Sequence, residues 1–217
     1  MHYSDQRSIL PVIIQNPLLP TRYSSFHQIN YEIHSGFTLD EETFIQKALA
    51  IIDNRLLDEK ILQNMYQICG TSGCLFAPGV WSRSKLAKNK EYSGIHDLLR
   101  FQLMCLKLEI EENRFPVIHL YPTYEKSDTQ AEGKLGCISC ISHGSKFSIE
   151  GAFHIKLNQH NLDTTNEQIG NSIYWAGTIV HEMLHNLGHK HQINDYTDQW
   201  QINVFEKCFL YNGNYVS

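Results

Sequence analysis

The stretch from His181 to His191, HEMLHNLGHKH, concentrates four histidines, one glutamate and one glycine. It completes a longer segment, NSIYWAGTIVHEMLHNLG, in which apolar residues recur every three or four positions, as in a helix with a buried face. His181 and His185 are four residues apart, so on a helix their imidazoles leave the same face, one turn apart. The segment therefore predicts a buried helix that carries two metal-binding side chains at its end.

A third ligand is needed to complete such a site. Two imidazoles can bind one zinc ion through nitrogen at about 2.0–2.1 Å, but a catalytic zinc usually has three protein ligands. Gly188 lies where a helix C-terminus favours a left-handed residue, so the chain can turn sharply and bring His191 back to the metal. We therefore expect one catalytic Zn²⁺ ion, bound by His181, His185 and His191. The remaining histidine, His189, is expected to point to solvent or toward substrate.

Glu182 adjoins the first expected ligand, and the arrangement H-E-x-x-H is typical of zinc peptidases whose glutamate is a general base. Over residues 175–191, the full string H-E-x-x-H-x-x-G-x-x-H resembles the zinc signature of the metzincin metallopeptidases, the clan of astacins, matrixins and reprolysins. The resemblance implies a zinc-dependent endopeptidase that hydrolyses a protein or peptide substrate, with Glu182 as the catalytic base. It also implies a twisted mixed sheet, two long helices and a cleft bordered by a strand that pairs with extended substrate.

Two other functions use the same residues. One is a zinc-binding protein of the same fold without catalysis, and the other is a zinc hydrolase that acts on a non-peptide substrate. The intact Glu182 argues against the first, because a purely structural zinc site does not need a base.

The chain departs from the metzincin pattern downstream of the third histidine. Metzincins have a methionine turn beneath the metal, but no methionine follows Met183 here. Cys208 is a candidate for the equivalent apolar position, with a plain core cysteine as the alternative. Tyr211 is a candidate for the phenol that steadies the oxyanion in some members of the clan.

Three acidic residues compete with His191 as the third ligand. Glu206 follows His185 at a spacing like that of thermolysin-type enzymes, whose third ligand is a glutamate. Asp195 and Asp198 resemble the downstream aspartates of other zinc peptidases, although turn chemistry in NDYTD explains them equally simply.

The rest of the chain predicts a mixed α/β (α+β) domain. Helices are expected over FTLDEETFIQKALAIIDNRLL, which begins with a capping box at Thr38 and Glu41, over DEKILQNMYQI and over GIHDLLRFQLMCL. Strands are expected at FPVIHLY and GAFHIKLNQ, separated by a polar loop, and the second of them is the candidate cleft strand. Residues 1–36, rich in Pro, Ser, Asn and aromatics, are interpreted as an N-terminal extension or wrapping arm, and residues 37–217 as a single zinc metallopeptidase domain.

The six cysteines are expected to be mostly free thiols. The pairs Cys69/Cys74 and Cys137/Cys140 are the most able to close a disulfide locally. The segment CISCISH also allows a small structural zinc site of Cys137, Cys140 and His143, with His154 as a further ligand.

Charge and hydropathy restrict the partners. The net charge is −5 with histidine neutral, so no basic excess draws the chain to nucleic acid or an anionic membrane. We find no apolar run long enough to cross a bilayer and no clear secretory signal. These features favour a monomer that is cytoplasmic or exported by a route without a classical signal.

Overall fold

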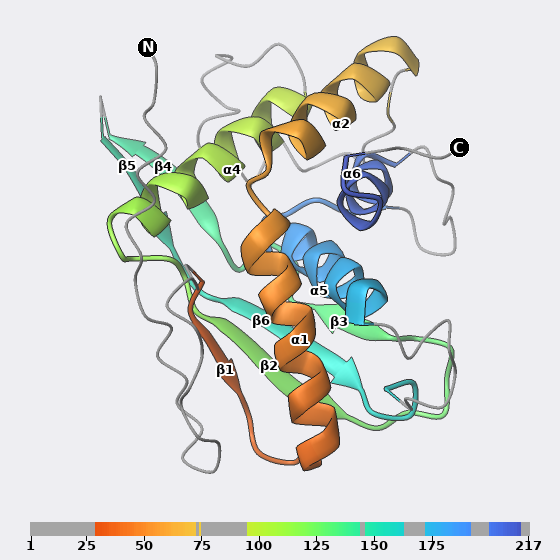
Figure 1. The fold of residues 1–217 in the computed structure, drawn as a ribbon. Helices are drawn as coiled ribbons and strands as arrows, with labels where there is room; N and C mark the ends of the chain where they lie inside the picture. The colour runs from red at the N-terminus through yellow and green to blue at the C-terminus, as the bar shows by residue number, and fades with distance from the viewer. Residues whose placement is uncertain are drawn as a thin grey trace.

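A four-stranded mixed sheet forms the base of the fold, and two helices lie over one of its faces (Figure 1). The computed structural model describes residues 29–72, 74, 95–143, 146–162, 172–191 and 200–213. The strand order is β1-β2-β6-β3, with bounds Tyr31–Ile33, Ile118–Thr123, Phe153–Asn158 and Ala131–Gly133. β1, β2 and β6 are parallel, whereas β3 runs antiparallel to β6 at the edge. The predicted α+β class is confirmed at this level.

The helices that cover the sheet are α1 (Leu39–Arg55) and α5 (Ser172–Asn186), which pack against each other. The capping box predicted at the start of α1 is present: the Thr38 backbone N–H donates to the Glu41 carboxylate at 2.7 Å, and the Glu41 N–H donates to the Thr38 hydroxyl at 3.3 Å. Satisfying these two N–H groups fixes where α1 begins.

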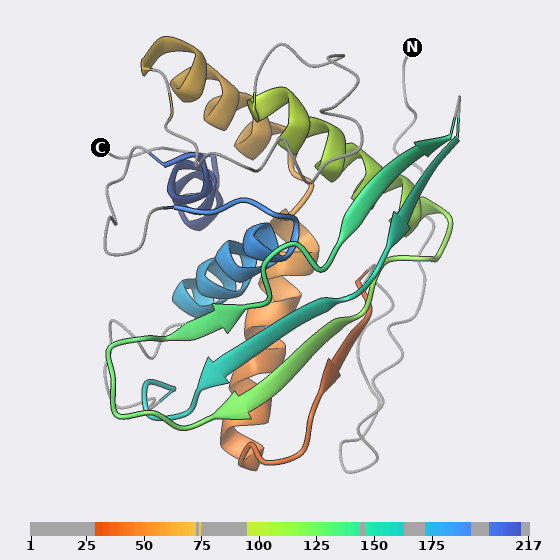
Figure 2. The same ribbon diagram turned by 180° about the vertical axis from the view of Figure 1, so that it is seen from behind.

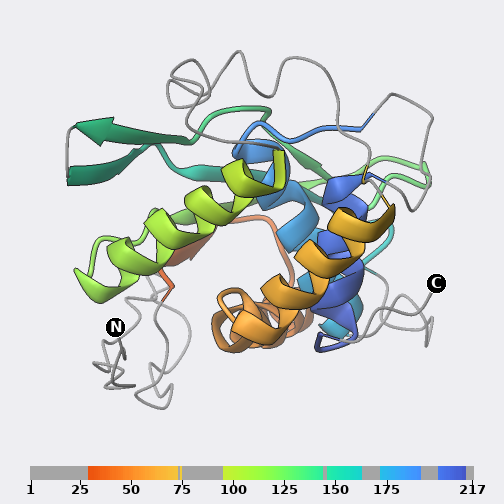
Figure 3. The ribbon, with the colours of Figure 1, turned by 90° about the horizontal axis from the view of Figure 1, so that it is seen from above.

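Three further helices complete the layer above the sheet: α2 (Glu59–Ser72), α4 (Ile95–Glu111) and α6 (Gln201–Leu210). Viewed from above, α2 lies against α6 and reaches one end of α4 (Figure 3). α6 also packs along α5, so it can support the helix that carries the histidines.

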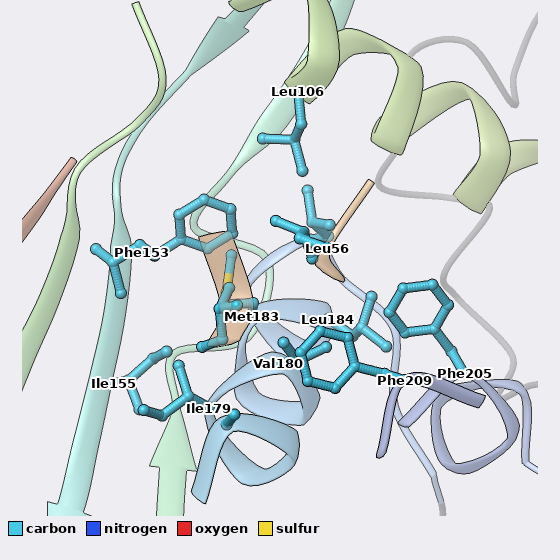
Figure 4. Packing of buried hydrophobic residues seen from close by; sticks show 14 of the residues in the cluster. Leu56, Leu106, Phe153, Ile155, Ile179, Val180, Met183, Leu184, Phe205 and Phe209 are labelled. Carbon is cyan, nitrogen blue, oxygen red and sulfur yellow. The ribbon is translucent and has the colours of Figure 1, made fainter. Parts of the chain in front are cut away.

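The apolar stripe of α5 forms the centre of the core (Figure 4). Ile179 and Met183 face Phe153 and Ile155 of β6, and the other side of the stripe meets the phenylalanines of α6. These side chains are at most 2 % exposed. Fully burying a side chain of this kind stabilises the fold by roughly 1.5–3 kcal/mol, so α5 is held firmly in place.

Five elements were not predicted. They are β1, β3, α6 and the hairpin of β4 (Ser139–His143) and β5 (Lys146–Glu150). β1 lies within the segment interpreted as an arm, so the end of that segment belongs to the main sheet. β3 lies within the expected polar loop.

The prediction that the strand of GAFHIKLNQ borders the cleft is wrong. β6, the strand of GAFHIKLNQ, is hydrogen-bonded to β2 on one side and to β3 on the other, so it has no free edge over its central residues. The edge beside α5 is formed by β3 instead. The reason is that the short antiparallel β3 inserts between β6 and solvent.

Four of the cysteines are free, namely Cys105, Cys137, Cys140 and Cys208, and Cys69 is joined to Cys74 by a disulfide. Cys137 and Cys140 point to different partners. The Cys137 thiol contacts the Asn186 side chain of α5, whereas the buried Cys140 thiol interacts with Cys105 of α4. The structure therefore does not join them, and the side chain of His143 lies outside its described part.

None of the described helices is long and apolar enough to span a membrane.

Candidate metal centre

Helix α5 presents His181 and His185 from one face near its C-terminal end. Their ring centroids are 4.9 Å apart, as expected for residues one helical turn apart. The buried stripe described above holds the helix on the opposite side. The two imidazoles are therefore fixed relative to the sheet before any metal binds.

The chain turns back immediately after α5, at Gly188. The Gly188 N–H donates to the His185 carbonyl at 2.9 Å, and the His189 N–H donates to the Leu184 carbonyl at 3.0 Å. This pair of bonds is the Schellman motif, and it requires a left-handed residue, here Gly188 with φ +99°. The left-handed glycine predicted at this position is confirmed.

The turn brings the third histidine to the other two. The His191 ring lies 5.5 Å from that of His181 and 5.2 Å from that of His185. One nitrogen of each ring can be chosen so that all three lie within 4.8 Å of one another. The three predicted metal-ligating residues are thus brought together, and the donor set is three imidazoles, which suits Zn²⁺ and other divalent transition metals.

Hydrogen bonds orient two of these rings. Nδ1 of His181 lies 2.8 Å from a Glu206 carboxylate oxygen, and Nδ1 of His185 lies 2.7 Å from the His189 carbonyl oxygen. Both partners are acceptors, so each Nδ1 carries the hydrogen and each Nε2 keeps a lone pair for a metal. The tautomers of both rings therefore fit a metal ligand.

The two rings differ in basicity. Burial, together with the charge of the neighbouring His181, lowers the pKa of His185 to about 3, so His185 is in the neutral form that binds a metal. Burial also lowers the pKa of His181, but the hydrogen bond and negative charge of Glu206 outweigh it and the net pKa is raised. Glu206 thus makes His181 the more electron-rich ligand.

Glu182, the predicted base, is only 8 % exposed and lies beneath the edge strand β3. Its carboxylate interacts with the Gly133 backbone N–H, and a Cβ on Gly133 would lie 2.8 Å from Oε2 of Glu182. Burial raises the pKa of Glu182 to about 7, although the charge of His181 opposes the shift. Only glycine allows β3 to approach the carboxylate this closely.

Asn186, which was not among the predicted site residues, joins the helix to the sheet. Its side chain is fully buried; its oxygen accepts from the His154 N–H at 2.5 Å, and its nitrogen donates to the Glu182 carbonyl at 2.8 Å. This amide therefore links α5 to β6 by hydrogen bonds, in addition to the apolar packing between them. The only signal in the sequence is that Asn186 follows Glu182 by one helical turn, so the two side chains lie on the same side of the helix.

The expectation for His189 is wrong. Its side chain is 3 % exposed, and its Nε2 lies 2.6 Å from the Gln102 side-chain oxygen on α4. Burial lowers its pKa to about 4, so it is neutral and donates this hydrogen bond. The reason is that the turn at Gly188 directs His189 inward, against α4, and sends His191 to the metal centre.

The alternative ligands and the two downstream candidates lie as follows. Glu206 is on α6, and its carboxylate contacts Nδ1 of His181. It therefore supports the candidate ligand His181 through the ring nitrogen that is not left free for a metal. Asp195 and Asp198 lie outside the described residues. Cys208 is fully buried in the core, where burial raises the pKa of its thiol to about 11, and Tyr211 is 48 % exposed at the end of α6.

Removing the Glu206 carboxylate tests its supporting role. We expect Glu206→Ala to weaken metal binding 10–100-fold, as is typical for loss of a group that orients a ligand, and Glu206→Gln, which keeps an acceptor, to weaken it less. Competition against a chelator measures both, with the exposed Glu111→Ala as control. Equal affinity in Glu206→Ala and the parent would show that this contact does not tune the site.

No protein-family model, curated protein or solved structure matches this chain.

Proposed function

We propose that the protein is a zinc-dependent endopeptidase. The observation that carries this proposal is the convergence of His181, His185 and His191, with Glu182 buried beside them under an edge strand. A bound zinc ion would polarise the scissile carbonyl and supply an activated water molecule. The neutral His185 imidazole and the hydrogen bonds that Nδ1 of His181 and Nδ1 of His185 make are the features that favour a metal here over a simple histidine cluster.

Glu182 is the residue proposed to move the proton. Its carboxylate is next to a ligand in sequence but belongs to none of the groups of converging metal-ligating atoms found among the described residues. It is therefore available to accept a proton from the attacking water and to return it to the leaving amine. The Gly133 N–H holds the carboxylate on the side of β3.

The edge of β3 is the proposed docking site for substrate. Among the described strands, β3 pairs with β6 alone, so its outer backbone groups face away from the sheet. An extended peptide can add to such an edge through main-chain hydrogen bonds. Because Gly133 of β3 touches Glu182, a peptide on this edge would lie close to the proposed base.

A metzincin-like fold is part of the proposal. The sheet has parallel strands and one antiparallel edge strand, and α1 and α5 are two long helices over one face (Figure 1). This arrangement agrees with what the signature implies. The missing methionine turn means that the support under the metal differs, and the core side chains of α6 are proposed to provide it.

A non-peptide zinc hydrolase and a zinc-binding protein without catalysis are the alternatives. The edge strand beside Glu182 favours a peptide over a small non-peptide substrate. The buried carboxylate favours catalysis over binding alone, because burying an unused charge is costly.

Metal removal tests the proposal directly. We expect the purified chain to cleave members of a proteome-derived peptide library, to lose that activity on treatment with a chelator, and to recover it when Zn²⁺ is added back. His185→Ala should bind one equivalent fewer than the parent. Cleavage by a chain shown to be metal-free would refute the proposal, and activity confined to non-peptide esters or amides would favour the alternative hydrolase.

A further inference from the structure

A second group of metal-ligating side chains lies on the opposite face of the sheet. Along β1 and β2 the residues that face α1 and α5 are apolar, whereas Glu32 and His119 alternate with them and face away. Glu32 and His119 are directly opposite each other in the parallel register. His34 follows two residues after Glu32, so it is on the same face. No described helix covers this face, which Figure 2 shows from the front.

The donor atoms of these three residues converge. Nδ1 of His119 is 3.1 Å from Nε2 of His34 and 3.1 Å from a Glu32 carboxylate oxygen, and that oxygen is 3.9 Å from Nε2 of His34. Donors at zinc-ligand distances around a tetrahedral ion lie roughly 3.3–3.6 Å apart. The observed separations bracket this spacing.

Hydrogen bonds among Glu32, His34 and His119 cannot satisfy all of the converging polar atoms at once. If Nδ1 of His119 carries a hydrogen, that single N–H cannot point at both His34 and Glu32. If it carries none, its lone pair accepts from His34 but lies against the negative carboxylate. A cation at the centre removes the conflict, because all three residues can direct a lone pair toward it.

Neighbouring aromatic rings hold the two histidines in place. The His34 ring stacks on Tyr121 with centroids 4.1 Å apart, and the His119 ring stacks on His154 at 5.2 Å. The Tyr121 hydroxyl and Nδ1 of His154 lie 3.2 Å apart, which links the two supporting rings. The three candidate ligands are 21–35 % exposed, so an ion can reach them from solvent.

We propose that Glu32, His34 and His119 form a second zinc site, separate from the metal centre on α5. Two imidazoles and one carboxylate are a donor set that Zn²⁺ accepts, with water completing the coordination. The ion would join β1 to β2. Since β1 is an edge strand of three residues, such a link would hold the start of the described chain on the sheet. This site does not depend on the proposed peptidase activity.

Zinc titration of the full-length chain tests the second site. The first centre is removed by the double substitution His185→Ala, His191→Ala, and Zn²⁺ binding is then measured by competition with a chromophoric chelator. We expect this chain to retain one equivalent. Adding His34→Ala or His119→Ala should weaken that equivalent by more than ~100-fold, beyond the 10–100-fold typical of losing a mere supporting partner. His160→Ala, which removes an exposed histidine outside the group, should leave it unchanged.

The variants also distinguish a chain that does not fold from failure of this proposal or of the peptidase proposal. Glu32→Gln keeps the shape of the side chain and should fold while binding zinc more weakly, so it provides the test if an alanine variant does not fold. The proposal is overturned if the double variant binds no more zinc than the same chain carrying Glu32→Gln or His34→Ala. That result would leave the peptidase proposal intact, whereas loss of peptide cleavage alone would leave the second site intact.

Discussion

Glu182→Gln is expected to retain the metal and the fold but to reduce peptide turnover by at least 10²–10⁴-fold, the usual contribution of a general base. The amide has nearly the shape of the carboxylate but cannot accept the proton. The hydrogen bonds that orient His181 and His185 go to Glu206 and to the His189 carbonyl, and not to Glu182. Metal content should therefore remain at the level of the parent. The measurements are kcat/KM on a cleaved peptide, metal content and the unfolding midpoint of the same preparation.

The matched control for this change is Glu111→Gln, which makes the same substitution at an exposed carboxylate on α4. It should keep the activity of the parent. A folded, metal-loaded Glu182→Gln chain with full activity would show that another group takes the proton. Since Glu182 is buried, its neutral replacement should not lower stability, and a large loss of the unfolding midpoint would indicate a structural role instead.

The long elements of the fold could be predicted because their apolar spacing is regular over many residues. α5 and α1 each bury one face, and β6 alternates apolar and polar side chains, so each carries its own periodicity. β1 and β3 have three residues each, which is too short for any period to be recognised. Their pairing is decided by the neighbours β2 and β6, and no local signal in the sequence encodes it.

The candidate site likewise has features that the sequence reveals and features that it does not. The convergence of the three histidines follows from helix geometry and one left-handed glycine, both of which are local. Several partners of the site residues come from elsewhere: Glu206 of α6 contacts His181, Gln102 of α4 contacts His189, and the Gly133 N–H of β3 contacts Glu182. Which side chain supports which ligand depends on how these elements pack, and sequence spacing does not reveal it. His189 shows the difference, since His185 and His191 on either side of it belong to the candidate metal centre, whereas His189 turns into the core.

The second large effect, a loss of metal affinity, is expected from replacing the third ligand. His191→Ala removes one of three donors, and we expect metal affinity to fall by more than the 10–100-fold typical of losing a supporting group. Glu206→Ala, by contrast, should stay within that range, because its carboxylate contacts a ligand and not the centre of the donor group. Competition against one chelator ranks the two variants on one scale.

Gly188 tests whether the turn delivers that ligand. A Cβ at this position would meet nothing within 4 Å, so any effect of a side chain here comes from the backbone conformation and not from a clash. At φ +99° a β-branched residue is strongly disfavoured, whereas asparagine tolerates a positive φ better. Gly188→Val should therefore lower metal affinity nearly as much as His191→Ala, and Gly188→Asn should lower it less. If Gly188→Val binds the metal as tightly as the parent while Glu206→Ala loses it, the third ligand is Glu206, and the metzincin-like assignment gives way to a thermolysin-like site.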